Sequence, residues 1–301
     1  MQDQAERLRI LMEKLNTPTS LDRSLNALSR CRLIVVTSGK GGVGKTNVSV
    51  NFALAMARKG KKVLLFDADM GLANVDVMLG LIPKYTLLNV LSGQKSLAEI
   101  IVEGPCGIQV VASGSGGVQE LADLNEAQRG KFLDALRELQ HQSDIILIDT
   151  GAGLHRNVLA FVLAAEEAVI ITTPEPTALM DAYGMIKILY KEKRNPVVTV
   201  IVNMALNQKE ADEAGKKLVL LSKRFLNLEV DYGGFIPRDE NMIRAVKEQR
   251  PILLSSPLSP AAVSLNRLAE NLLLGKLNHS EGNLINFFKR VTQVFGGANN
   301  G

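Results

Sequence analysis

The chain of 301 residues has no tryptophan, only two cysteines and no long run of apolar residues. Cys31 and Cys106 stand far apart and form no C-x-x-C motif, which argues against a disulfide framework and leaves too few thiols for a structural zinc site. No stretch approaches the roughly 20 apolar residues of a membrane-spanning helix, and residues 1–15 are too rich in charge for a signal peptide. We therefore expect a cytoplasmic protein whose contact with a membrane is peripheral.

The chain also has little excess charge of either sign. It has 35 Lys and Arg residues and 31 Asp and Glu residues, for a net charge of +4. A dedicated nucleic-acid-binding domain usually carries a larger basic excess that is gathered on one face. The balance argues against direct nucleic-acid binding. Hydrophobic residues make up 46% of the chain, which is enough for one core that needs neither disulfides nor metals.

The apolar pattern divides the chain into three zones. Residues 1–30 begin with an amphipathic helix, and residues 276–301 hold a second one. Residues 31–275 alternate short β-branched strands with longer helical patterns, so we expect an α/β domain with a mostly parallel, doubly wound sheet and helices on both faces. The predicted strands are Leu33–Val36, Val63–Phe66, Ile108–Val111, Ile145–Ile148, Ala168–Ile171, Val197–Val202 and Phe235–Ile236. The longer predicted helices are Asn47–Lys59, Asn125–Gln140, Thr177–Lys193, Lys209–Phe225 and Pro260–Leu273.

A phosphate-binding loop follows the first of these strands and opens a helix. Its residues fit the pattern G-x-x-x-x-G-K-[ST], and they are Gly39, Lys40, Gly41, Gly42, Val43, Gly44, Lys45 and Thr46, with Asn47 next in the helix. Glycines let backbone N–H groups turn towards phosphate oxygens, and the helix N-terminus adds partial positive charge. In this pattern Lys45 reaches the β- and γ-phosphates and the Thr46 hydroxyl binds Mg²⁺.

Acidic side chains end two further predicted strands. Asp67 and Asp69 follow one strand at alternate positions, so they point the same way, and Asp149 ends another. Ligands of open α/β sheets sit at the carboxyl ends of the strands. These carboxylates therefore predict a Mg²⁺ site formed by Thr46, Asp67 and Asp149 and a position for the attacking water.

Lys40 is not needed by the phosphate cradle itself, and the form K-G-G-V-G-K-T resembles the deviant phosphate loop of the MinD/ParA family. The resemblance implies that Lys40 reaches the nucleotide of a partner subunit, so that ATP binding and homodimerisation are one event. It also implies that Asp69 positions the attacking water, supported by Asp67 and Asn74. The segment Asp149-Thr150-Gly151-Ala152-Gly153 resembles the family's second switch, although many relatives carry a proline where Gly151 stands.

The base site is expected from two further segments that resemble the family. Asn203 ends a predicted strand, and its amide matches the family's adenine-reading asparagine. Pro237, Arg238 and Asp239 match the second base-contacting loop, although Asp239 also suits the N-cap of a following helix. The guanine-reading motif N/T-K-x-D is missing, so ATP with Mg²⁺ is the expected ligand pair.

The tail helix has one apolar face and one mildly basic face. Leu284, Phe287, Phe288, Val291 and Phe295 lie on the apolar face, which suits a membrane interface. The MinD group uses such a C-terminal helix for membrane targeting, which implies reversible contact with the cytoplasmic face of the inner membrane. The alternative is that this helix docks on the protein's own surface, and both hold if ATP releases it.

The N-terminal segment Asp3-Gln4-Ala5-Glu6-Arg7-Leu8-Arg9 resembles the activator motif of the flagellar-number regulators within this family. Asp3, Gln4, Leu8 and Arg9 would then contact a partner. The resemblance implies an antiactivator that binds a σ54-dependent master regulator of the FleQ type and works with the FlhF GTPase, including at the cell pole.

Two other functions stay open at this stage. One is a ParA-type partition ATPase that binds DNA, which the small net charge and the apolar tail helix disfavour. The other is a metabolic or iron–sulfur relative, which would need a substrate pocket or paired cysteines. Without the resemblance, the residues predict an ATP-dependent dimerising switch and no more.

Overall fold

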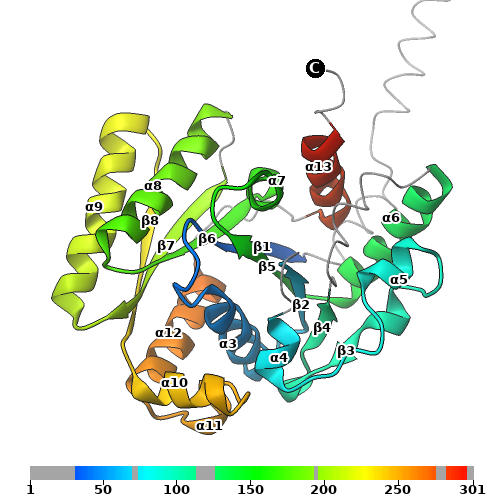
Figure 1. The fold of residues 1–301 in the computed structure, drawn as a ribbon, viewed down its shortest axis with the longest axis horizontal. Coiled ribbons are helices and arrows are strands. Elements are labelled where there is room, and N and C mark those ends of the chain that lie inside the picture. The colour runs from blue at the N-terminus through cyan, green and yellow to red at the C-terminus, as the bar shows by residue number, and fades with distance from the viewer. Residues whose placement is uncertain (1–30, 70–73, 113–125, 193–195, 276–282, 297–301) are drawn as a thin grey trace, which may run out of the picture. The chain divides into compact units, whose positions relative to one another are not determined.

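The computed structural model describes residues 31–69, 74–112, 126–192, 196–275 and 283–296 (Figure 1). The predicted N-terminal helix, with Asp3, Gln4, Leu8 and Arg9, lies outside the described residues. The tail helix belongs to the same unit as the sheet, Cys31–Gly301, and residues 1–30 are set apart from it.

An eight-stranded sheet forms the centre of the second unit, in the order β3-β4-β2-β5-β1-β6-β7-β8. The strands are β1 Arg32–Ser38, β2 Val63–Ala68, β3 Val102–Glu103, β4 Gln109–Ala112, β5 Ile145–Ala152, β6 Glu167–Thr172, β7 Val197–Ala205 and β8 Asp231–Pro237. All neighbours pair in parallel except β3 and β4. The predicted mostly parallel sheet is therefore confirmed, and the short antiparallel β3 was not predicted.

Helices cover both faces of this sheet (Figure 1). They are α3 Lys45–Arg58, α4 Val75–Leu79, α5 Leu87–Leu91, α6 Glu126–Gln142, α7 Arg156–Ala164, α8 Pro176–Lys191, α9 Gln208–Leu226, α10 Glu240–Lys247, α11 Ile252–Ser255, α12 Pro260–Leu274 and α13 Leu284–Gly296. Side-chain caps define several starts, since Asn207 accepts the N–H of Glu210 before α9 and Ser259 accepts that of Ala262 before α12. These are the polar residues that satisfy the free N–H groups of a first turn.

Strand β1 shows how the two layers of the core arise. Leu33 and Val35 belong to the apolar cluster beneath α6, α7, α8 and α13, whereas Ile34 and Val36 belong to the cluster beneath α3 and α12. Successive side chains of a strand point to opposite faces, so a continuous apolar strand needs cover on both. The central strands are thus buried on both faces, whereas the edge strands β3 and β8 are partly exposed.

The tail helix α13 packs on the sheet layer through the face that was predicted to meet a membrane. Leu284, Phe287, Phe288 and Val291 are each at most 3% exposed. The ring of Phe288 meets that of Phe66 at 5.5 Å between centroids, in an edge-to-face arrangement. In this structure, therefore, the apolar face is covered by the protein itself, which is the alternative that the sequence left open. The side chain of Phe295 lies outside the described residues.

The interaction of α13 with α7 is also polar. The guanidinium of Arg156, the first residue of α7, donates hydrogen bonds of 2.6 and 3.2 Å to the carbonyl oxygen of Val294. Arg290 lies 3.6 Å from the carboxylate of Glu166. In the described ranges, no helix is both long and apolar enough to cross a bilayer.

Candidate functional site

The phosphate loop lies between β1 and α3 and has the backbone of an anion site. Gly42 and Gly44 have φ of 79° and 85°, the left-handed region that favours glycine. Gly44 is the N-cap of α3 and has no side-chain cap. The first N–H groups of a helix have no partner within the helix, so this terminus offers donors and partial positive charge to a phosphate.

Gly39 is required by close packing and not by its backbone angle. A Cβ at this position would collide with the backbone of Asp181 in α8. The start of the loop is therefore pressed against α8. Gly41 has open space beside it, so the structure gives no steric reason for a glycine there.

Lys45 and Thr46 meet Asp149 beneath the loop. The Nζ of Lys45 lies 3.0 Å from Asp149 Oδ1, and the Thr46 hydroxyl donates to Asp149 Oδ2 at 2.8 Å. A third donor, the Ser49 hydroxyl, lies 2.6 Å from Asp149 Oδ1. Asp149 is fully buried and Lys45 is 6% exposed, so three donors hold one carboxylate in place.

Asp67 lies beside Asp149, because the two residues are partners in the pairing of β2 with β5. Burial raises the pKa of Asp67 to about 7, and the neighbouring Asp149 carboxylate adds to this rise. The backbone N–H groups of Asp69, Asn74 and Val75 donate to Asp67 and act in the opposite direction. The structure thus brings together Thr46, Asp67 and Asp149, the predicted Mg²⁺ ligands.

The two predicted switch segments lie side by side next to this pair. Asp69 Oδ1 lies within van der Waals reach of a Cβ at Gly151, and the Asn74 amide donates to Asp69 Oδ2 at 3.4 Å. Gly153 has φ of 98°, and its N–H donates to the carbonyl oxygen of Ser38 at the end of β1. The second switch segment is therefore joined to the base of the phosphate loop, and the first lies beside the second.

Lys40 lies apart from this cluster. Its Nζ donates to Glu175 Oε2 at 3.0 Å and to the Thr177 hydroxyl at 2.8 Å, where α8 begins. The side chain remains 38% exposed. The two lysines of the loop therefore differ, since Lys45 points inwards to Asp149 and Lys40 is held at the surface.

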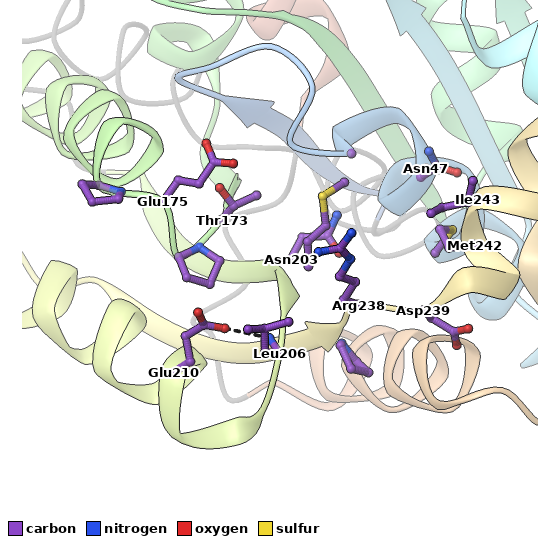
Figure 2. A pocket seen from close by; sticks show the side chains of 15 residues that line it. Asn47, Thr173, Glu175, Asn203, Leu206, Glu210, Arg238, Asp239, Met242 and Ile243 are labelled. Carbon is purple, nitrogen blue, oxygen red and sulfur yellow. Dashed lines mark hydrogen bonds between the residues drawn. The ribbon is translucent and has the colours of Figure 1, made fainter.

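A cavity of about 620 Å³ adjoins the loop (Figure 2). The predicted base-site residues Asn203, Pro237, Arg238 and Asp239 all line it, together with Asn47, which was predicted to bind nucleotide as part of the phosphate-loop segment. In Figure 2, Thr173 and Glu175 flank it on one side, and Met242 and Ile243 on the other. The chain forms one continuous site, with a phosphate cradle, two carboxylates and a cavity large enough for a base.

Asp239 is used mainly as a structural cap. Its carboxylate accepts the N–H of Asn241 at 2.9 Å and that of Ala261 at 3.1 Å, and so joins the starts of α10 and α12. Both oxygens are engaged, which leaves Pro237 and Arg238 as the freer part of this loop. The alternative prediction for Asp239, the N-cap of the following helix, is confirmed.

A family model described as "ParA: NUBPL iron-transfer P-loop NTPase" matches residues 30–273. The chain belongs to the ParA/MinD family of P-loop NTPases. The two cysteines are free, one buried and one exposed, so they do not form the pair that an iron–sulfur relative would need.

Individual members of the ParA/MinD family match nearly the whole chain. The antiactivator FleN of Pseudomonas aeruginosa is 38% identical over 272 residues, which cover 90% of this chain and 97% of FleN. The flagellum site-determining protein YlxH of Helicobacter pylori is 35% identical over 302 residues, which cover 98% and 100%. The solved structure of MinD with Mg-ADP from Pyrococcus horikoshii has a TM-score of 0.66 at 28% identity and covers 81% of this chain and 98% of its own.

The residues present in this ParA/MinD member fit a nucleotide with Mg²⁺. Mg²⁺ prefers oxygen ligands and is usually held by one or two carboxylates together with substrate phosphates and water. The Thr46 hydroxyl and the Asp67 and Asp149 carboxylates are such a set. Among the described residues no group of three or more His, Cys, Asp or Glu could hold a metal, so a Mg²⁺ ion here would depend on phosphate oxygens as well.

Sequence reasoning missed Ser49, Glu175 and Met204. Ser49 carried a signal, because it follows Lys45 by one helical turn and must share its face. Glu175 is 135 residues from Lys40, and no local pattern joins them. Met204 lines the cavity at a point where β7 is distorted, and no sequence pattern indicates that distortion.

Proposed function

We propose that this protein is an ATP-hydrolysing switch that forms a homodimer with ATP and Mg²⁺ and controls the number of flagella. The observation that carries the proposal is the position of Lys40. Lys40 is the residue that distinguishes this phosphate loop from the general G-x-x-x-x-G-K-[ST] pattern. Its amine donates hydrogen bonds to Glu175 and Thr177 at the surface and does not point into the phosphate cradle of its own subunit. This exposed position supports a role for Lys40 on the nucleotide of a second subunit.

Each part of the site has a role in this proposal. The loop N–H groups and Lys45 bind the phosphates, and Thr46, Asp67 and Asp149 hold Mg²⁺, which neutralises charge on the phosphate oxygens when bound. Asp69 orients the attacking water. Lys40 from the partner subunit meets the charge that develops during phosphoryl transfer, as an arginine finger does. Asn203, Pro237 and Arg238 bind the base.

The regulatory part of the proposal is supported by the relatives. FleN is named an antiactivator and YlxH a flagellum site-determining protein. We therefore propose that the ATP-bound dimer restrains a σ54-dependent activator of the FleQ type. Residues Asp3–Arg9, which resemble an activator motif, would stimulate an FlhF-type GTPase.

Membrane contact is proposed through α13. In the form described here the helix is docked on a groove that contains Phe66, Phe132 and Phe161. Its apolar face must leave this groove before it can meet lipid. Two residues that contact α13 are close in the chain to the switch segments. Arg156 follows the Gly151–Gly153 segment and donates to the Val294 carbonyl, and Phe66 directly precedes Asp67 and packs on Phe288. A change at the switches on ATP binding would thus reach α13 and release it to the cytoplasmic face of the inner membrane, including at the pole.

The first test is the mass in solution, by light scattering, of the wild type and of Asp69→Ala and Lys40→Ala variants with ADP and with ATP-Mg²⁺. We expect monomers with ADP, a dimer of Asp69→Ala that accumulates with ATP, and loss of the ATP-dependent dimer in Lys40→Ala. A wild type of the same mass in both nucleotides would refute the dimerising switch. A Lys40→Ala variant that dimerises normally would refute the role of this lysine.

The membrane step is tested by sedimentation with vesicles that contain anionic lipid. The full chain should sediment with ATP and stay in solution with ADP, and a chain lacking residues 283–301 should lose this difference, with a run without vesicles to subtract any pelleting caused by its uncovered apolar surface. Equal sedimentation of the truncated chain would show that α13 is only a packing element.

A further inference from the structure

The side chain of Asn203 joins the base-side cavity to the phosphate loop. It lies near the carboxyl end of β7, is 5% exposed, and lines the cavity. Its Nδ2 donates a hydrogen bond of 2.8 Å to the carbonyl oxygen of Val43, a loop residue that is 3% exposed. An amide has two N–H groups and one oxygen, so one N–H is used by the loop and the other groups are left for a ligand.

Gly44, the next residue of the loop, is shaped around the same amide. A Cβ on Gly44 would collide with the Nδ2 of Asn203. In a trans peptide the carbonyl and the following N–H point in opposite directions, so a bond to the Val43 oxygen also sets the direction of the Gly44 N–H. One hydrogen bond from Asn203 therefore orients a donor of the phosphate cradle.

The strand that carries Asn203 is distorted at this point. The pairing of β7 with β8 is irregular between Asn203 and Ala205, and Met204 between them has φ of 59°. A residue other than glycine in the left-handed region is strained, and such strain persists where the surrounding structure fixes it, often at functional sites. Bulges of this kind re-aim a neighbouring side chain, and here the neighbour is the amide that contacts the loop.

We propose that Asn203 is a positioning residue of the phosphate loop, which acts through Val43 and Gly44, and that reading adenine is the smaller part of its role. The inference rests on the proposed nucleotide binding and deepens it. Without the N–H donor, a buried carbonyl loses its partner and the loop is less ordered before a ligand arrives. Binding of phosphates should then weaken whichever base is attached, or with no base at all.

The test is calorimetric binding of Mg-ATP, Mg-GTP and Mg-tripolyphosphate to the full chain as wild type, Asn203→Ala and Asn203→Asp. We expect Asn203→Ala to weaken all three by a similar factor, about tenfold. Asn203→Asp keeps the shape but puts a carboxylate oxygen against the Val43 carbonyl, so it should weaken all three further. Ile243→Ala, a change at another residue that lines the cavity, is the matched control and should weaken only the two nucleotides.

Thermal unfolding without ligand separates positioning from misfolding, because both Asn203 variants should melt cooperatively, as the control does. Asn203→Ala with weaker ATP binding but unchanged tripolyphosphate binding would overturn the proposal and leave a base-reading residue. If tripolyphosphate proves too weak a ligand for the wild type, the nucleotides decide, since equal losses for ATP and GTP support positioning and a loss for ATP alone refutes it. A wild type that binds neither ATP nor tripolyphosphate would instead refute the proposed function.

Discussion

The phosphate loop at the carboxyl edge of the sheet and the tail helix α13 on one of its faces are held by different forces. The loop is fixed by directional contacts, among them the bond from Asn203 to Val43 and the backbone angles of its glycines. The helix is held mainly by apolar side chains such as Phe287 and Phe288. Apolar burial has no preferred direction, so another apolar surface can replace the groove of α13. No other surface can replace the contacts of the loop in this way, because those contacts depend on direction.

The largest effect is expected from Phe288→Ala, which tests the apolar side of this comparison through the free energy of unfolding. Phe288 is 1% exposed and packs edge-to-face on Phe66 and Phe132. Truncation of a buried phenylalanine costs about 3–5 kcal/mol in free energy of unfolding. Chemical denaturation should show this loss, whereas Lys289→Ala on the exposed side of the helix should cost less than about 0.5 kcal/mol. Equal effects of the two variants would mean that α13 is not docked in solution.

The second prediction concerns Lys45→Ala, which acts on chemistry and leaves the apolar core untouched. Loss of a preorganised charge at the phosphates lowers turnover by about 100-fold or more. Steady-state release of phosphate from ATP would measure it, with Lys59→Ala, an exposed lysine paired with Glu270, as the control. Hydrolysis that survives in Lys45→Ala would place the phosphates elsewhere.

These two regions also differ in what could be predicted from the sequence. The glycines, Lys45, Thr46 and Asp149 form a local pattern in which few side chains suit phosphate and Mg²⁺, so their meeting point was predictable. The apolar face of α13 predicts only that it is buried, and either lipid or protein can bury it. Its partners Phe66 and Phe132 are far away in the chain, and no local pattern identifies them.

The smallest effect, on the affinity of the ATP-bound dimer, is expected from Glu175→Gln, which weakens the surface ion pair with Lys40. Exposed ion pairs contribute about 0–1 kcal/mol, so freeing Lys40 should favour the ATP dimer by no more than about fivefold. Sedimentation equilibrium with ATP-Mg²⁺ would measure the dimer affinity. The control is Glu270→Gln, which breaks another exposed Lys–Glu pair and should change nothing. A weaker dimer in Glu175→Gln would mean that Glu175 belongs to the interface instead.

Docking of α13 has a consequence for what happens when it leaves. Its departure wets two apolar surfaces at once, the helix face and the groove beneath it, which contains Phe66, Phe132 and Phe161. The groove of one copy fits the tail of any other copy as well as its own, which is the condition for domain swapping. Under the proposed membrane contact, lipid and a neighbouring molecule would then compete for the same helix. At high protein concentration and without membrane, exchanged tails would join two copies by a route that needs no nucleotide.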